Sequence, residues 1–363
     1  MKKTLVAAAL LTAAFTWGCE ETTTDTATPR QAQLKLGDGW TIPLNEVYDG
    51  GPGKDGIPAV SEPKFISVEE VDYLSDEDLV LGFAEGGEIR AYPHNILNWH
   101  EIVNDRVGDA YISVTYCPLT GTGIGWNRVI DGEVNTFGVS GLLYNTNLIP
   151  YDRLTDSHWS QIRGDCVNGK LIRRQIETHH LVETTWRTWK EMYPSSKVMS
   201  TETGYGRNYL VYPYAGYTLM DDFLLFPVSH TDSRLLKKER VHGIVISGSA
   251  RVYQFSDFGE QVIIKQDQFK GQDFVIVGNG KDNFIASYQS DPGDGTVLEF
   301  KAVQDQYPVV MTDQECNAWD LFGMAVSGPR EGTRLKPSGG FNGYWLAFAA
   351  FFPGAQISGP AHF

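Results

Sequence analysis

A cysteine and a histidine in the first half of the chain are the residues best suited to chemistry. Cys117 follows the alternating run of residues 111–116 and precedes Pro118, so we expect a thiol at the sharp exit of a strand. His100 lies between Trp99 and Glu101, beside a short helical pattern. A thiolate and an imidazole are suitable ligands for copper or another soft transition metal. The pair therefore predicts a metal site.

The same two residues allow other interpretations. Cys117 could act as a nucleophile with His100 as its base, and Glu101, Asp105 or Tyr144 would then orient the ring. Alternatively, Cys117 is a small buried apolar residue and His100 is hydrogen-bonded to the backbone. These readings leave open whether the protein is an enzyme.

A second group of polar and aromatic residues could line a site for a small ligand. Its members are Tyr144, Asn145, Asp152, Arg153, Trp159 and Gln161. Residues of these types more often satisfy buried turns through salt bridges and bonds to the backbone. The structural role is therefore the favoured interpretation for this group.

A stretch of sequence after residue 80 recurs after residue 241. Three pairs are 161 positions apart, namely Gly82 and Gly243, Arg90 and Arg251, and Tyr92 and Tyr253. Two tryptophan pairs continue the match, Trp159 with Trp319 and Trp186 with Trp345. Self-similarity at a fixed spacing indicates a repeated unit. We predict an internal duplication that gives two tandem related lobes, at about residues 80–200 and 241–358.

The two predicted copies differ at the candidate site. Gly280 occupies the position that matches Cys117, and Gly259 the position that matches His100. Because the matching glycines and tryptophans occur in both copies, we expect one scaffold built twice and one site built once.

The hydrophobic pattern predicts a β-rich α+β fold. Apolar residues alternate around glycine turns in residues 80–91 and 241–252, which is typical of hairpins. Helical patterns are confined to residues 94–103, 184–193 and 343–352.

The N-terminus has the pattern of an exported protein. Lys2 and Lys3 precede an apolar run over residues 5–15 that is too short to span a bilayer. We therefore predict a signal peptide at residues 1–18, lipidation of Cys19 and a flexible tether over residues 19–32. The protein would be a periplasmic or cell-surface lipoprotein, held to the membrane by its N-terminal lipid.

Three parts would follow the tether. We expect an N-terminal segment at residues 33–79, a first repeat lobe with the candidate site at residues 80–240, and a second repeat lobe at residues 241–363. No later segment is apolar enough to cross a membrane.

Cysteine count and charge limit the chemistry further. With Cys19 lipidated, three cysteines remain, so at least one thiol is unpaired. Cys166 and Cys316 flank the matching tryptophans, and a disulfide between them would join the lobes. The net charge is −15, and loss of Lys2 and Lys3 would leave 28 basic against 45 acidic residues, a charge of −17. Such an acidic chain disfavours nucleic acid as a partner.

Several long motifs resemble a known family of exported bacterial proteins, the domain-of-unknown-function family 3179. They include residues 51–58, 90–93, 99–105, 116–119, 138–145 and 344–353. Many proteins of that family show Cys-Pro-Leu-Cys-Gly, whereas Thr120 occupies the second cysteine position here. A Cys-x-x-Cys redox or metal pair is therefore absent from this sequence.

The resemblance implies no particular activity, so three functions remain open. The protein could bind a copper-like metal through Cys117 and His100 in the first lobe. It could be a non-enzymatic surface binding or scaffold protein that uses the groove between the lobes. It could also be a thiol-dependent hydrolase or transferase.

Overall fold

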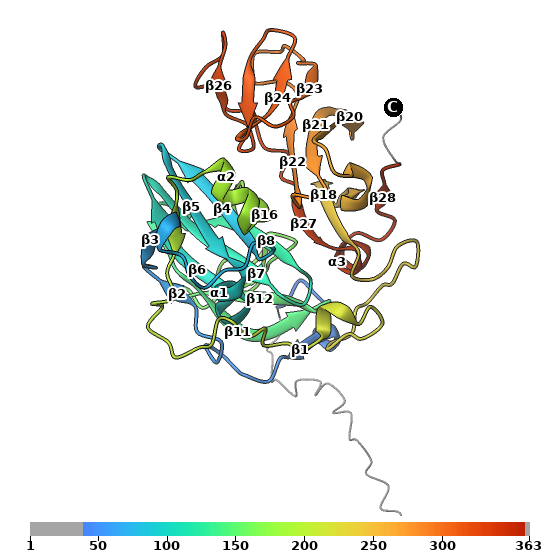
Figure 1. Cartoon of the computed structure of the whole chain (residues 1–363). Coiled ribbons are helices and arrows are strands. Elements are labelled where there is room, and N and C mark those ends of the chain that lie inside the picture. The colour runs from blue at the N-terminus through green and yellow to red at the C-terminus, as the bar shows by residue number, and fades with distance from the viewer. Residues whose placement is uncertain (1–38, 360–363) are drawn as a thin grey trace, which may run out of the picture.

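The computed structural model describes residues 39–359, and the predicted signal peptide, Cys19 and tether lie outside this range. Strands dominate the described residues, and helices are few and short, which confirms the β-rich α+β prediction (Figure 1). The α-helices are α1 (His94–His100), α2 (Trp186–Met192) and α3 (Trp345–Phe351). Within residues 39–359, no helix is both long and apolar enough to cross a membrane.

Most strands of the N-terminal half, residues 39–199, belong to three sheets. The first sheet has the order β16 (Val182–Thr185), β4 (Leu79–Glu85), β5 (Glu88–Pro93), β17 (Lys197–Met199), β3 (Phe65–Ser67). The second has the order β15 (Thr178–His179), β8 (Thr122–Asn127), β7 (Ala110–Cys117), β6 (Ile102–Val107), β2 (Val60–Ser61). The third has the order β1 (Val47–Asp49), β11 (Phe137–Tyr144), β12 (Asn147–Asp152), β13 (His158–Ser160), β14 (Asp165–Asn168). Strands β9 (Val129–Ile130) and β10 (Glu133–Val134) form a separate hairpin.

The C-terminal half, residues 240–359, also has three sheets. The first has the order β27 (Phe341–Tyr344), β18 (Arg240–Ile246), β19 (Ser249–Gln254), β28 (Gln356–Ile357). The second has the order β20 (Ile263–Phe269), β21 (Gln272–Asn279), β22 (Phe284–Gln289). The third has the order β23 (Phe300–Ala302), β24 (Val309–Asp313), β25 (Ala318–Asp320), β26 (Ala325–Ser327). Between the halves, residues 200–239 form a connecting segment with one 3-10 helix (Tyr217–Leu219) and no strand.

Each sheet of the C-terminal half repeats a strand order found in the N-terminal half. Strands β27, β18, β19 and β28 are ordered as β16, β4, β5 and β17 are, and the last strand of each set is parallel to its neighbour. The hairpins agree in register, since Gly82 lies opposite Ala91 and Gly243 opposite Val252. Both hairpins turn through two residues with positive φ, which permits a tight two-residue loop.

Side-chain contacts recur in the same places. An arginine and a tyrosine both bind one aspartate in each half: Arg90 and Tyr92 bind Asp105, and Arg251 and Tyr253 bind Asp267. A buried tryptophan also donates to an aspartate in each half: Trp159 to Asp152 at 3.1 Å, and Trp319 to Asp313 at 2.9 Å.

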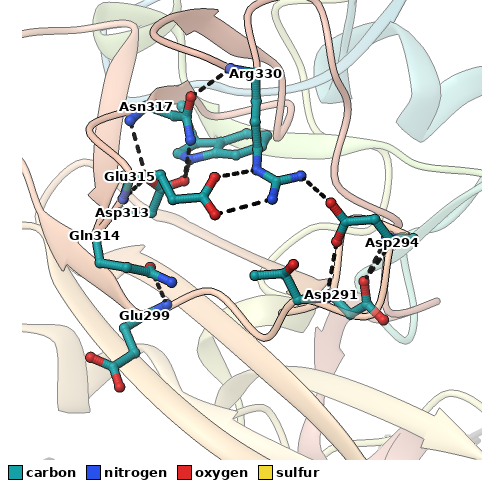
Figure 2. A network of polar contacts seen from close by, with 11 residues as sticks. Asp291, Asp294, Glu299, Asp313, Gln314, Glu315, Asn317 and Arg330 are labelled. Atoms are coloured by element: carbon teal, nitrogen blue, oxygen red, sulfur yellow. Dashed lines mark hydrogen bonds and ion pairs between the residues drawn. The ribbon is translucent and has the colours of Figure 1, made fainter.

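Figure 2 shows the polar network of the C-terminal half around Arg330. The Arg330 guanidinium binds Glu315 and reaches Asp294 at 2.7 Å, which ties the β24–β25 turn to the connection between β22 and β23. In the N-terminal half, Arg174 binds Asp131 in the same way, with an Nη2–Oδ1 distance of 2.8 Å. Asp131 and Asp294 are each followed by a glycine, Gly132 and Gly295.

The halves share their cores. Trp126, Trp159 and Trp345 belong to one buried cluster, although Trp345 comes from α3 of the C-terminal half. Trp189 of α2 packs edge-on against Phe322 of the C-terminal half, with ring centroids 6.2 Å apart. Strand β27 also lies against β8, and β16 lies against β22. Figure 1 accordingly shows the blue-to-green and orange-to-red parts side by side.

Candidate functional site

Cys117 is the last residue of β7, as expected for a thiol at a strand end, and it is buried. Its sulfur donates to the Thr146 carbonyl at 3.7 Å. Burial raises the pKa of the thiol to about 11, and the nearby Glu101 charge adds to this rise. The thiol is therefore protonated at neutral pH, which does not suit a ready nucleophile.

His100 is also buried, and both of its ring nitrogens have partners. Nδ1 lies 2.7 Å from the Pro58 carbonyl and Nε2 lies 2.7 Å from the Tyr209 hydroxyl. Because a carbonyl only accepts, Nδ1 carries the proton and Nε2 accepts from Tyr209. The histidine thus ties α1 to residue 58 and to the connecting segment.

In the structure, His100 and Cys117 each have hydrogen-bond partners other than one another. The lone pair of His100 is directed at Tyr209, and the sulfur of Cys117 is directed at Thr146. Across residues 39–359, no group of three or more His, Cys, Asp or Glu side chains is placed to hold a metal. Each of the two residues therefore has a structural contact of its own, and metal binding by Cys117 and His100 stays a prediction.

Thr120, at the position of the second cysteine in related sequences, joins a buried network of neutral groups. Its hydroxyl lies 2.8 Å from that of Thr122 and accepts from Asn147 at 3.0 Å. Gln161 completes the network, accepting from Thr122 at 2.8 Å and from Asn147 at 2.7 Å. Gln161 is therefore a core hydrogen-bonding residue.

The other predicted binding residues hold turns and loops. Asp152 accepts from Trp159, and Arg153 donates to Asp55 at 3.0 Å. Asn145 lies in the turn between β11 and β12, and its side-chain oxygen accepts from the Ser229 amide at 2.7 Å. Tyr144 packs edge-on against Phe351 with ring centroids 5.5 Å apart. These contacts do not converge on one ligand.

The predicted disulfide is not formed, because Cys166 and Cys316 are both free. Cys166 is buried in β14, where its sulfur donates to the Asn168 carbonyl at 3.2 Å. Cys316 is exposed in the turn before β25. The positions flanking the matching tryptophans therefore face different environments in the two halves.

A cavity of about 400 Å³ lies where α1, the end of β7, the connecting segment and the C-terminal half meet. Its most distinctive lining residues are polar or aromatic: His94, Asn98, Tyr116, Tyr212, Arg240 and Tyr344. His94 and Asn98 are one turn apart on α1 and so share a face. Tyr116 immediately precedes Cys117, which places the predicted thiol directly behind this cavity.

A buried ion pair supports the wall of the polar cavity. The Arg240 guanidinium binds the Glu183 carboxylate, which also accepts from the Asn342 amide at 3.4 Å. Burial opposes the charge on Glu183, but Arg240 and the hydrogen bonds outweigh it and lower the pKa of Glu183. Burial likewise opposes the charge on Arg240, and Glu183 outweighs it and raises the pKa of Arg240. Both groups therefore stay charged, and their charges cancel.

Polar atoms around this cavity lack partners. Asn98 Oδ1, Tyr212 OH and Arg240 Nε are buried and find no hydrogen-bond partner among the described residues. His94 Nε2 approaches Glu183 Oε2 to 3.2 Å but without the geometry of a hydrogen bond. A buried polar atom without a partner costs about 1–3 kcal/mol. A ligand that supplied partners would recover that cost.

Sequence reasoning missed most of this cavity. His94 begins α1, and Arg240 and Tyr344 belong to strands β18 and β27 of the other half. The sequence signals were Tyr116 and Tyr344, which belong to the motifs of residues 116–119 and 344–353. Chain segments more than 100 positions apart meet here, and no local pattern predicts such a meeting.

Taken together, fold and site define a class: a β-rich protein of two packed halves with a polar cavity where they meet. The chain belongs to the family described as "Protein of unknown function (DUF3179)", whose model matches residues 54–355. Comparison with curated proteins and with solved structures gave no match. The family description names no activity, so the function has to be argued from the site.

Proposed function

We propose that the protein is an exported, lipid-anchored binding protein that holds a small, uncharged, hydroxyl-rich ligand, of about the size of a monosaccharide, in the polar cavity. The observation that carries this proposal is the group of buried polar atoms without partners at the cavity wall. Tyr212 and Arg240 offer donors, whereas Asn98 offers an acceptor. Hydroxyl groups both donate and accept, so one ligand of this kind can satisfy all three.

The charge around the cavity favours a neutral ligand. Arg240 is neutralised by Glu183, so the wall holds no free positive charge for an anion. Asp78 also lines the cavity, and its carboxylate repels anions.

The aromatic side chains support the same ligand class. Burial raises the pKa of Tyr116, Tyr212 and Tyr344, so their phenols remain protonated and can donate. Their rings offer flat apolar surfaces beside these donors, a combination suited to a ligand with apolar faces and a polar edge.

The exported location rests on the N-terminal sequence, since residues 1–38 lie outside the described range. Lys2, Lys3, the short apolar run and Cys19 support cleavage before Cys19 and lipidation of that residue. Intact-mass measurement on protein extracted from membranes tests this, and recovery of a soluble chain that still begins at Met1 would contradict it.

We also propose that the two halves are copies of one duplicated unit. The proposal is supported by the repeated strand orders and by the repeated Arg-Tyr-Asp and Trp-Asp contacts. Strand β7 ends at Cys117 opposite Thr122, and β21 ends at Asn279 opposite Phe284. Asn279, one position before the Gly280 matched from sequence, is therefore the counterpart of Cys117.

Ligand binding is tested by calorimetry on the mature chain with a panel of monosaccharides and sugar alcohols. The informative variant is Tyr212→Phe, which removes only a hydroxyl that has no partner in the described structure. We expect unchanged or slightly higher stability and about fivefold to tenfold weaker binding, the value of one hydrogen bond. Tyr307→Phe, in the C-terminal half and outside the cavity, is the control. Absence of binding by every panel member, or equal binding by Tyr212→Phe, would overturn the proposal.

A further inference from the structure

A second cavity of about 300 Å³ lies on the other side of Asn98, whose side chain lines both cavities. Its walls are mainly apolar and include Trp99, Leu119, Leu148 and Phe226. Leu119 and Leu148 are buried in the core that also contains Cys117. Ligand sites in proteins commonly combine such walls with a few polar groups.

One buried carboxyl, that of Glu101, lines this apolar cavity. Its oxygen accepts from the Tyr214 hydroxyl at 3.1 Å. The other ionisable groups that face it are Tyr214 and Cys117, and neither carries a positive charge. Arg207 also lines the cavity, but it lies over the Trp99 ring at 5.6 Å from the centroid. The carboxyl therefore has no cationic partner in the described structure.

The backbone at Glu101 is strained. Glu101 follows α1 with a φ of 57°, a region that non-glycine residues rarely adopt. The carbonyl accepts from the Tyr116 amide at 2.7 Å, which fixes the chain in this position. Strain of this kind is concentrated at functional sites. This conformation ends α1 and leaves Glu101 at the wall of the apolar cavity.

We propose that the apolar cavity binds a hydrophobic primary amine, whose ammonium group pairs with Glu101 and whose apolar body lies against Leu148 and Phe226. An ammonium supplies the opposite charge that the buried carboxylate lacks. The rings of Trp99, Tyr214 and Phe226 line the same cavity and attract cations. The excess of acidic residues over the whole chain also favours a cation.

Other ligand chemistries fit the cavity less well. An organic anion would meet the Glu101 carboxylate in a site of low polarity, where like charges repel strongly. A neutral molecule of the same shape would bury the same apolar area but would leave the carboxylate without a counter-charge. The charge of the ligand is therefore the property that the experiment varies.

The proposal predicts a particular pH dependence. Burial raises the pKa of Glu101 to about 7, and the Tyr214 hydrogen bond opposes this only in part. An amine binds the ionised carboxyl, so its affinity rises as pH increases through 7. The affinity then falls when the amine loses its own proton, near about pH 10 as for a lysine side chain.

Calorimetry on the mature chain compares 2-phenylethylamine with 2-phenylethanol, which has the same apolar body and no charge. We expect the amine to bind at least about tenfold more tightly at pH 8, which corresponds to about 1.4 kcal/mol. Glu101→Gln should remove this preference and leave binding of the alcohol unchanged, which also shows that the cavity is intact. Asp320→Asn, which alters another buried acid far from the cavity lining, is the matched control and should change neither affinity.

The pH profile of the wild-type protein provides a test that needs no variant. A rise in amine affinity between pH 6 and 8, with no change for the alcohol, supports the proposal. Equal affinity for the two probes, an unchanged preference in Glu101→Gln, or no binding of the amine at pH 8 would each overturn it. Binding of hydroxyl-rich ligands in the polar cavity is measured separately with Tyr212→Phe, so failure of one site does not imply failure of the other.

Discussion

The two halves of the molecule share a strand framework and differ at the ends of two corresponding strands. In the N-terminal half, β7 ends with Tyr116 and Cys117 beside a polar cavity. In the C-terminal half, β21 ends with Gly278 and Asn279, and the Phe258 ring packs against Gly278 so closely that a Cβ there would lie 2.6 Å from it. The same backbone thus supports a cavity in one place and a filled core in the other.

The comparison shows which contacts belong to the framework and which to the site. The Arg-Tyr-Asp contacts and the buried tryptophans occur in both halves and hold sheets together. His94 of the N-terminal half corresponds in chain order to Phe255, an apolar residue at the start of the 3-10 helix Phe255–Phe258. Under the proposed function, side-chain differences at corresponding positions explain why the polar cavity forms beside β7.

The largest expected effect comes from the glycines that both halves place under a large ring. A Cβ at Gly82 would lie 2.1 Å from Trp189 Cζ3, and one at Gly243 would lie 2.0 Å from Phe348 Cε1. We expect Gly82→Ala and Gly243→Ala each to lower the free energy of unfolding by about 3 kcal/mol or more through overpacking. Urea denaturation measures this.

Gly206→Ala is the control, because nothing lies within 4 Å of a Cβ at that position. If Gly82→Ala or Gly243→Ala were as stable as this control, the equivalence of Gly82 and Gly243 in the two halves would be contradicted.

A smaller effect on stability depends on pH and distinguishes the buried acids Glu101 and Asp320. Burial raises the pKa of Glu101 to about 7 and that of Asp320 to about 6. Because the folded protein holds each proton more tightly than the unfolded chain, stability falls as pH rises from the unfolded pKa to the folded one. Each fall is about 3 kcal/mol at most. Between pH 6 and 7, Glu101 continues to lower stability while Asp320 no longer does.

Thermal melting of wild type, Glu101→Gln and Asp320→Asn at pH 5, 6, 7 and 8 measures this difference. The gap between wild type and Glu101→Gln should widen up to about pH 7, whereas the gap for Asp320→Asn should stop widening near pH 6. Melting temperatures that keep a constant gap at all four pH values would contradict the assignment.

The smallest effect concerns the three thiols and leaves stability unchanged. Cys316 is exposed, whereas Cys117 and Cys166 are buried and burial raises the pKa of each thiol to about 11. We expect iodoacetamide at pH 8 to modify Cys316 first. Cys117 and Cys166 should react more slowly by orders of magnitude. Mass spectrometry of peptides follows the reaction. Rapid modification of Cys117 would favour thiol chemistry over ligand binding.

Local patterns were sufficient to predict the elements of the fold. Alternating apolar residues around glycines predicted the hairpins β4–β5 and β18–β19, because side-chain direction alternates along a strand. The helix predicted over residues 94–103 ends at His100, since Glu101 adopts a positive φ and Ile102 begins β6. The end of α1 at His100 depends on the hydrogen bond that the Glu101 carbonyl accepts from the Tyr116 amide of β7. A local sequence pattern does not reveal this contact.

The site was less accessible from sequence. Cys117 was correctly placed at a strand end, but the hydrogen bonds of His100 to residues 58 and 209 of the folded chain were not foreseen. Arg240 and Tyr344 reach the cavity only because β18 and β27 pack beside α1 and β7. Such contacts depend on how the sheets pack together. The hydrophobic period and the residue spacing of the sequence do not encode this packing.

The packing of β16 on β22 and of β27 on β8 relates the two halves as two subunits of a symmetric dimer are related. Glu183 and Asn342, which are 159 positions apart, meet at the centre of this arrangement. In a dimer of identical chains the corresponding contact would join two glutamates, whose charges repel. In a single chain the two corresponding residues can differ. Here the Asn342 amide lies opposite Glu183, and Glu183 pairs with Arg240. The polar cavity beside Arg240 belongs to this asymmetric arrangement, and we expect one hydroxyl-rich ligand per chain.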